Sequence, residues 1–576
     1  MLEPALAEPL TRATGAEAES PPCLAAEPVV FGGHVGTLHR PTPEGARGLG
    51  LILCPPVGRD ARCAYRPMWS FACALADRGF PVLRYDHLAT GESLDLEPEA
   101  DLWAHWLAGV DAAAAFVRAY AGVRGVVLGG VRLGASLAAA AAERVRPDGL
   151  LLLAPVKSGR AWTREILAAS RLHPRPGADG PGEGLVEGDG VRLSPATLAS
   201  LQSFDLRRLG DPGAAVFLAT PEQSGSPPAS LGTNVEHAWF EGYDALFRDS
   251  HVNAAPLALF DRAARWLETL PAARALPVPA PPAPAAGLAT PSWTEQPVSF
   301  GSGLKGTLCL PSGEARPRSV IFGNTGGDPR GAGFAVQASR MLAGRGVASL
   351  RFDFAGLGES DGVDGWRSHI YETPRAEDLR AAAALLRRHG SRQLVLAGVC
   401  SGAYHALRGA IEDGDVCGVL AVNATDFAWR PGEPFSVGDE QDPRSSRFFL
   451  QGLVRPASWR RLLGGEVDPR TVLQTVGRRL WRRLRARVHS PATRALRREL
   501  ARLSARGVQI RILVGREDRA LDELEVHFGR DGGWLSRRRG LSVAILPGLD
   551  HSLATHQSQA LAAAELLRLV QACPDA

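Results

Sequence analysis

Short apolar runs alternate along the chain with stretches of helical period. In the first half the runs stand at 49–54, 81–85 and 125–128. Between them, residues 69–77 and 111–119 place apolar side chains every three to four positions. Buried strands that alternate with helices require crossover connections, so this pattern predicts an α/β fold with a largely parallel sheet.

The second half shows the same alternation. Its expected strands are 319–322, 347–352 and 393–397. Late apolar runs complete both halves, at 214–219 and 235–240 in the first and at 508–514 and 541–546 in the second. The two halves are therefore expected to have the same architecture.

The halves also share sequence. Residues 84–93 read RYDHLATGES, and residues 351–360 read RFDFAGLGES. Residues 129–135, GGVRLGA, match 397–403, AGVCSGA, at nearly the same offset, and Gly-Thr-Leu stands upstream in both halves. Matches in the same order at a nearly constant offset predict two divergent copies of one domain.

Residues 271–294 are rich in proline and alanine, a composition that continues neither a helix nor a sheet. We expect a linker there, with a first copy at 28–270 and a second at 295–572. Residues 1–27 are expected to be a disordered segment. The length of 576 residues agrees with two domains, because single cores rarely grow beyond about 300 residues.

A candidate nucleophile follows the strand expected at 393–397. The sequence Gly-Val-Cys-Ser-Gly matches a tight strand-to-helix turn in which small residues stand two before and two after the nucleophile. Gly398 and Gly402 frame Cys400, whereas Ser401 lacks such glycines. A helix N-terminus and a nearby histidine both lower a thiol pKa and so activate cysteine. The alternative is a structural cysteine buried beside a turn.

The partners of the nucleophile are expected after later strands. His551 follows the run at 541–546 and is suited to proton transfer near neutral pH, with a surface histidine as the alternative. Asp518 follows the run at 508–514 and would orient His551, although the adjacent Glu517 could substitute.

An oxyanion hole needs two backbone N–H groups. One is expected from Ser401, which follows the candidate nucleophile. The other is expected from the loop after the strand at 319–322, most simply from Thr325, with Asn324 or Gly326 as alternatives.

With these motifs the second copy resembles the α/β-hydrolase superfamily, in particular its serine aminopeptidase-like and dienelactone-hydrolase-like branches. The order nucleophile, aspartate, histidine is the family's order. The resemblance implies two tandem α/β-hydrolase domains and ester or thioester cleavage through an acyl-Cys400 intermediate, with no cofactor and no metal. Cysteine stands where the family usually has serine, which leaves an acyltransferase as the alternative.

The first copy lacks the same chemistry. Arg132 stands at its nucleophile position, and a guanidinium cannot attack. Ala245 stands at the base position and Glu222 near the acid position, while His251 could replace only the base. We expect a pseudo-hydrolase, in which Arg132 either holds a carboxylate or phosphate or points to solvent. A non-catalytic scaffold made of both copies is the second hypothesis.

An insert at about 424–505 is expected to form a helical lid. Its arginines recur with apolar residues at helical spacing, for example at 478–487. Three interpretations compete: a solvated face over the pocket, a site for an anionic carrier of the acyl substrate, and peripheral contact with anionic lipids. The net charge of +4 and the lack of a recognised motif argue against a nucleic-acid partner.

Composition is that of an ordinary globular protein, with 45% hydrophobic and 22% charged residues. The eight cysteines include no CxxC pair, so neither zinc nor a disulfide framework is expected. No signal peptide and no apolar run of membrane-spanning length stand in the sequence, and the cytoplasm is the expected location.

Overall fold

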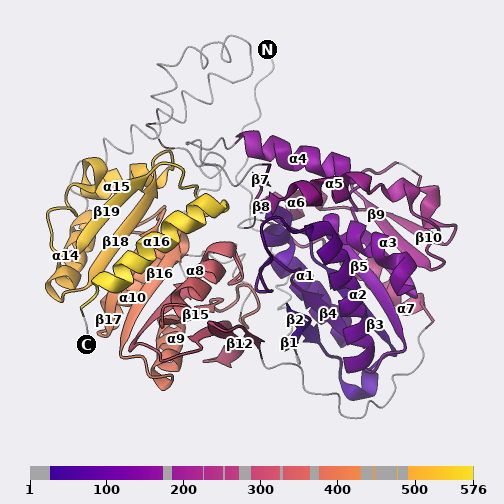
Figure 1. The fold of residues 1–576 in the computed structure, drawn as a ribbon, viewed down its shortest axis with the longest axis horizontal. Coiled ribbons are helices and arrows are strands. Elements are labelled where there is room, and N and C mark those ends of the chain that lie inside the picture. The colour runs from indigo at the N-terminus through magenta and orange to yellow at the C-terminus, as the bar shows by residue number, and fades with distance from the viewer. Residues whose placement is uncertain are drawn as a thin grey trace, which may run out of the picture.

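Two sheet-and-helix units make up the chain in the computed structural model (Figure 1). The structure describes residues 26–172, 184–224, 226–248, 250, 253–271, 287–324, 328–362, 371, 375–429, 445, 447, 477 and 491–574. The N-terminal segment expected to be disordered, most of the linker and most of the expected lid insert therefore lie outside the described residues. Within the insert the structure describes one helix, α14 (Pro491–Ala505).

The first copy has an eight-stranded sheet. Across the sheet its strands are β1 (Ala26–Phe31), β2 (His34–His39), β4 (Val82–Tyr85), β3 (Leu49–Cys54), β5 (Gly125–Val131), β6 (Gly149–Leu153), β9 (Ala215–Thr220) and β10 (Val235–Trp239). Its helices are α1 (Arg59–Asp77), α2 (Leu102–Tyr120), α3 (Leu133–Val145), α4 (Gly159–Leu172), α5 (Pro195–Ser203), α6 (Tyr243–Leu246) and α7 (Leu257–Thr269). A separate ribbon joins β7 (Val186–Gly188) to β8 (Val191–Leu193).

The second copy has a nine-stranded sheet. Its strands run in the order β11 (Leu288–Ala289), β12 (Trp293–Phe300), β13 (Leu304–Pro311), β15 (Ala348–Phe352), β14 (Arg318–Gly323), β16 (Gln393–Val399), β17 (Val416–Val422), β18 (Gln509–Gly515) and β19 (Leu541–Leu546). Its described helices are α8 (Gly333–Ala343), α9 (Ala376–Arg388), α10 (Ser401–Glu412), α14, α15 (Ala520–Phe528) and α16 (His556–Ala572).

The two sheets share one topology. Apart from the added β11, the first strand of each copy pairs antiparallel with the second, and the second pairs antiparallel with the fourth. The remaining pairs are parallel, and the fourth strand precedes the third in the order across the sheet. The predicted α/β class, with a mostly parallel sheet in each of two copies, is confirmed.

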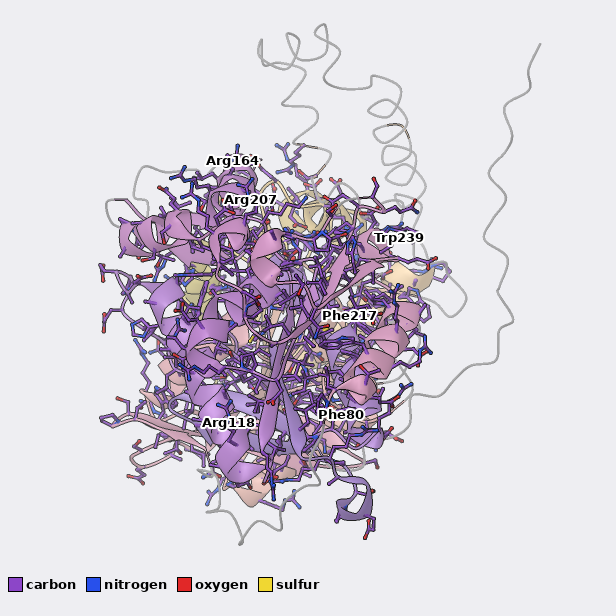
Figure 2. The ribbon with its side chains drawn as sticks, turned by 90° about the vertical axis from the view of Figure 1, so that its right-hand side faces the viewer. Phe80, Arg118, Arg164, Arg207, Phe217 and Trp239 are labelled. Carbon is purple, nitrogen blue, oxygen red and sulfur yellow. The ribbon has the colours of Figure 1, made fainter. Side chains whose placement is uncertain are left out.

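Helices bury both faces of each sheet. In the first copy, Trp106 and Val110 of α2 pack on one face, while Phe71 of α1 stacks on Phe260 of α7 on the other. Figure 2 shows Phe217 of β9 within this core and Arg207 at its periphery. Burial on both faces explains the nearly continuous apolar runs of the strands. No helix among the described residues has the length and apolar character needed to cross a bilayer.

The copies meet through the glutamates of their repeated Gly-Glu-Ser segments. Glu359 of the second copy reaches into the first, where its carboxylate accepts a hydrogen bond from Thr37 Oγ1 at 3.0 Å and pairs with Arg84 Nη1 at 2.9 Å. These groups are largely buried, so the pairing takes place away from bulk water.

The reciprocal contact runs from the first copy into the second. Glu92 accepts a hydrogen bond from Thr307 Oγ1 at 2.6 Å and pairs with Arg351 Nε at 3.1 Å. Glu92, Thr307 and Arg351 are the repeat equivalents of the three residues in the first contact. The interface therefore has approximate two-fold symmetry, in which each copy presents the same patch to the other.

Candidate active site

Cys400 lies in the turn between β16 and α10. Its backbone has φ 52° and ψ −116°, which is a strained conformation for a residue with a side chain. The side chain is 9% exposed, and Sγ lies 3.4 Å from Thr425 Oγ1. A strained residue at the start of a 12-residue helix has the geometry of a nucleophile elbow.

Gly398 and Gly402 are required by the tightness of this turn. A Cβ atom on Gly398 would lie 2.2 Å from the carbonyl carbon of Gly402. A Cβ atom on Gly402 would lie 2.9 Å from the carbonyl oxygen of Gly323 at the end of β14. Both approaches are to backbone atoms, so neither position accommodates a larger residue without displacement of the strand or the helix.

His551 and Asp518 are brought together by the loops after β19 and β18. The Nδ1 atom of His551 lies 2.8 Å from Asp518 Oδ2. The other carboxylate oxygen of Asp518 accepts a hydrogen bond from the backbone N–H of Ala520 at 2.7 Å, which fixes the carboxylate. Glu517, the alternative acid, is exposed. The geometry thus selects Asp518 over Glu517 as the partner of His551.

The imidazole of His551 is also hydrogen-bonded to the Cys400 thiol. Burial lowers the pKa of His551, but Asp518 and Cys400 outweigh burial and raise this pKa well above its ordinary value of 6.5. Sulfur, imidazole and carboxylate form one chain of hydrogen bonds. Such a chain can move a proton from the thiol to the imidazole, whose positive charge the carboxylate stabilises.

Asn423, which the sequence motifs did not identify, holds the loop that carries His551. It follows β17 with φ 46°, and its Nδ2 donates to the carbonyl oxygens of Asp550 and His551 at 2.8 and 3.0 Å. Its Oδ1 accepts from the N–H of Gly515 at 2.9 Å. Asn423 therefore ties the two loops of His551 and Asp518 to the central sheet. An asparagine directly after a buried strand was the signal in the sequence.

Thr425 and Tyr371 were also missed, and they lie beside the thiol. The hydroxyl groups of Tyr371 and Thr425 are 3.0 Å apart. Burial first, and then the nearby Cys400, raise the pKa of Tyr371 well above 10. The Tyr371 ring contacts the rings of Tyr404 and Trp429, so one side of the site is aromatic.

Only some of the residues expected to form the oxyanion hole lie in the described part of the chain. Ser401 is the first residue of α10, where helical N–H groups point beyond the helix end. The alternative residue Asn324 lies against the elbow, and its side chain accepts from the N–H of Phe354 and donates to Asp353. Thr325 and Gly326 lie outside the described residues.

Arg132 occupies the matching turn of the first copy, with φ 55° and ψ −123°. Its guanidinium lies 3.0 Å from Asp60 and 2.6 Å from Glu165. Burial lowers the Arg132 pKa, but these carboxylates outweigh burial and raise it above its ordinary value. Of the two interpretations of Arg132, the guanidinium pointing to solvent is corrected, because Arg132 holds carboxylates that belong to the protein itself.

Among the described residues, the other expected positions of the first copy form no catalytic arrangement. Ala245 lies in the short helix α6. Glu222 is exposed and pairs with Lys157 at 2.8 Å, a hydrogen bond that lowers the Glu222 pKa. His251 lies outside the described residues. Within the described part of the chain, no group of three His, Cys, Asp or Glu side chains is arranged to hold a metal ion.

Comparison with known proteins finds one family model and several solved structures. The model of the alpha/beta hydrolase family matches residues 320–564. An alpha-beta serine hydrolase homologue from Coxiella burnetii is 16% identical, with a TM-score of 0.28 over 48% of this chain and 95% of its own. Dienelactone hydrolase from Anabaena variabilis is 15% identical, with a TM-score of 0.29 over 49% and 99%. An esterase from Pyrococcus furiosus is 15% identical, with a TM-score of 0.31 over 49% and 95%. No curated protein matches the sequence.

The strand order and the elbow define the class of the fold, which is that of the α/β hydrolases. The second copy is similar to the alpha/beta hydrolase family over residues 320–564. The first copy has the same strand order, around an elbow that carries arginine.

Proposed function

We propose that the second copy hydrolyses an ester or thioester through an acyl-Cys400 intermediate. The observation that carries the proposal is the hydrogen-bonded chain Cys400–His551–Asp518 at a strained elbow. A buried structural cysteine has no need of a histidine held in place by a fixed carboxylate. The first copy acts as a non-catalytic partner domain, because Arg132 has no nucleophilic atom.

In the first half-reaction, His551 takes the thiol proton and the Cys400 sulfur attacks the carbonyl carbon. The N–H of Ser401 and a second N–H from the loop after β14, expected from Thr325, stabilise the tetrahedral oxyanion. When this intermediate collapses, the bond to the alcohol or thiol breaks. The imidazolium of His551 gives its proton to the leaving group, and the acyl group remains on Cys400.

In the second half-reaction, His551 takes a proton from water, and the hydroxide attacks the acyl-cysteine. The carboxylic acid leaves and the thiol is restored. An ester or thioester suits this cycle better than an amide. With an amide, the tetrahedral intermediate would expel the Cys400 thiolate more easily than an unprotonated amine and would return to the substrate. The aromatic side of the site, formed by Tyr371, Tyr404 and Trp429, supports an apolar acyl group.

The test is the intact mass of the protein after brief incubation with p-nitrophenyl esters and N-acetylcysteamine thioesters of increasing chain length. We expect one acyl adduct on the wild type and none on Cys400→Ala. Cys63→Ala, which removes a buried thiol of the first copy, is the matched control and should keep the adduct.

The lifetime of the adduct separates the alternatives. Loss of the adduct in water within minutes identifies a hydrolase. An adduct that persists in water but is released by an added alcohol, thiol or amine identifies an acyltransferase. No adduct across the panel, together with no alkylation of Cys400 by iodoacetamide in the native protein, refutes the proposal in favour of a scaffold.

A further inference from the structure

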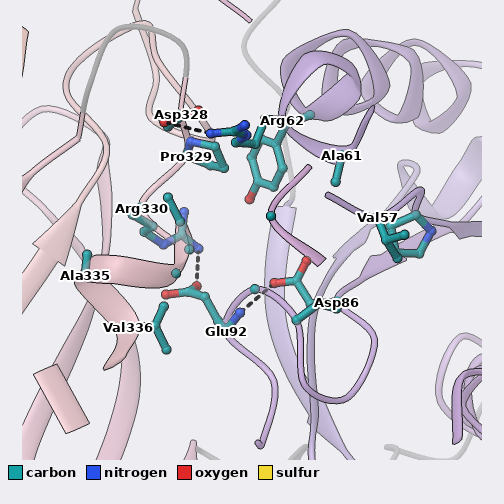
Figure 3. A pocket seen from close by; sticks show the side chains of 18 of the residues that line it. Val57, Ala61, Arg62, Asp86, Glu92, Asp328, Pro329, Arg330, Ala335 and Val336 are labelled. Carbon is teal, nitrogen blue, oxygen red and sulfur yellow. Dashed lines mark hydrogen bonds and ion pairs between the residues drawn. The ribbon is translucent and has the colours of Figure 1, made fainter. Parts of the chain in front are cut away.

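A cavity of about 580 Å³ lies between the two copies. Its walls come from both, including Cys54 to Gly58 of the first copy and Asp328 to Gln337 of the second (Figure 3). The cavity reaches Val399, but the described lining does not include Cys400. Its lining also includes Asn324 and Gly398, so the cavity lies next to the candidate active site without including Cys400, Asp518 or His551.

The second copy shows how a buried aspartate is neutralised next to this cavity. Asp353, in the repeated Arg-Phe-Asp segment, is 2.7 Å from the Arg330 guanidinium and accepts the N–H groups of Arg330 and Glu359 at 2.8 and 3.1 Å. Arg330 also pairs with Glu359 at 3.2 Å and with Glu92 at 3.1 Å. One guanidinium thus connects Asp353 to both interface glutamates.

The equivalent aspartate of the first copy, Asp86, has no such cation. It accepts the N–H of Glu92 at 2.9 Å, as Asp353 accepts that of Glu359, but forms no ion pair with any described residue. Asp86 lines the cavity instead (Figure 3). Burial, together with the neighbouring Glu92 and Glu359, raises the Asp86 pKa to about 6, although the hydrogen bond from the Glu92 N–H and the charge of Arg84 act to lower it. The ionised form of Asp86 is therefore less stable than it would be with a positively charged partner.

Other lining atoms favour a ligand that donates hydrogen bonds. Asp328 Oδ1 and Gln559 Oε1 are buried acceptors without a partner in the described structure. The unpartnered donors of the lining, on Arg330 and Arg351, belong to guanidinium groups whose other nitrogens are already ion-paired. Asp328 and Gln559 thus offer a ligand two buried acceptors in addition to the carboxylate of Asp86.

We propose that this cavity binds a small organic cation. Its guanidinium or ammonium head would lie beside Asp86, in the place that corresponds to the one that the Arg330 guanidinium takes beside Asp353 in the second copy. The apolar part of the ligand would pack on the cavity walls, which include Val57, Met68 and Val336. This proposal does not rest on the acyl-transfer chemistry proposed for Cys400.

Isothermal titration calorimetry of the full chain with butylguanidinium and butylurea tests the proposal. The two probes have nearly the same shape, but only butylguanidinium is charged. We expect wild type to bind butylguanidinium at least tenfold more tightly than butylurea. Asp86→Asn should lose this preference, and Glu222→Gln, which removes an exposed carboxylate outside the cavity, should keep it.

A pH series on the wild type makes the same test without a substitution. Binding of butylguanidinium should weaken as the pH falls from 7.5 to 5, because Asp86 takes up a proton near pH 6. The charged groups that act on Asp86 are Glu92, Glu359 and Arg84, and the pKa of Glu359 is lowered to about 2, so Glu359 stays ionised over this range. His556, which also lines the cavity, is held by Glu187.

Three results would overturn the proposal: equal affinity for the two probes, binding of neither, or a preference for the cation that survives in Asp86→Asn. If Asp86→Asn does not fold, a constant affinity of the wild type for butylguanidinium between pH 7.5 and 5 would overturn the proposal instead.

Discussion

Cys400 and Arg132 adopt nearly the same backbone angles although one is a thiol and the other a guanidinium. The conformation of the elbow is therefore imposed by the strand, the helix and the glycines around the residue. The chemistry depends on the side chain placed there and on its partners. A motif can indicate such a position from sequence, since the glycine spacing is local; it indicated Cys400, whereas Asp518 and His551 were expected from their places after later strands.

Residues that only the folded chain brings to the site were not predicted from the sequence. Asn423, Thr425 and Tyr371 reach the site from the end of β17 and from a segment far upstream, and no local spacing links them to Cys400. Their roles follow from which strand ends lie side by side in the sheet. A repeat comparison does mark Asn423, because the first copy, which lacks the histidine, has Ala154 at the same place with φ 47°.

Asn423→Ala tests the positioning of His551. Ala154 shows that alanine tolerates this backbone conformation, so the substitution removes only the hydrogen bonds. We expect the rate of Cys400 acylation to fall at least tenfold with little change in KM, since each buried group left unpaired costs about 1–3 kcal/mol. Stopped-flow measurement of p-nitrophenol release gives both constants. An unchanged rate would show that the loop is held by other contacts.

Asp518→Asn tests the charge on His551. In the wild type the His551 pKa is raised by folding, so the stability from this proton is complete below about pH 6.5 and is lost as the pH rises through the folded pKa. We expect the melting-temperature difference between wild type and Asp518→Asn to be largest at pH 6.5 and to narrow toward pH 9. The corresponding difference in unfolding free energy changes by at most about 1.4 kcal/mol per pH unit. A difference independent of pH would mean that His551 is neutral throughout.

At the scale of elements, the apolar runs predicted strands more accurately than helices. The runs at 49–54 and 541–546 coincide with β3 and β19, and the other expected strands differ by a few residues. Helix α1 begins at Arg59, ten positions before the helical stretch expected at 69–77, and it contains Pro67. Proline removes one backbone hydrogen bond from a helix, and α1 continues through Pro67 with ten of its residues buried in the core.

Gly134→Ala tests whether the elbow of the first copy is retained for packing. A Cβ atom at Gly134 would lie 2.1 Å from the carbonyl oxygen of Cys54, a closer approach than the 2.9 Å at Gly402. We expect Gly134→Ala to lower the unfolding free energy by about 1–3 kcal/mol, the usual cost of overpacking. A loss of this size would show that the turn matters for packing even in a copy without a nucleophile. Gly210→Ala, at a position with free space around it and without a positive φ, is the matched control. Equal melting temperatures of Gly134→Ala and Gly210→Ala would contradict this prediction.

At the scale of the whole molecule, the reciprocal contacts of Glu92 and Glu359 hold the copies together. Removal of one partner from a buried ion pair costs about 3–5 kcal/mol, because the other charge stays buried. A protease site inserted in the linker at 272–286 allows the chain to be cut without loss of either copy. We expect the two fragments of the wild type to co-elute in size-exclusion chromatography after cleavage.

The fragments of a Glu92→Ala, Glu359→Ala chain should separate after the same cleavage. Glu236→Ala, which removes an exposed partner of Arg262, is the matched control and should leave the fragments together. Co-elution of the doubly substituted fragments would show that apolar contacts alone are sufficient.

The reciprocal interface has the form of a homodimer contact, with the two subunits joined end to end. In a dimer of identical chains every substitution occurs twice, so a change that destroys the nucleophile destroys both sites. Fusion removes this constraint. Arg132 can replace the nucleophile of one copy while Cys400 is kept in the other, and Arg330 can occupy one side of the axis while the other side stays open. Duplication within one gene thus gives the protein two related pockets that can evolve independently on a shared frame.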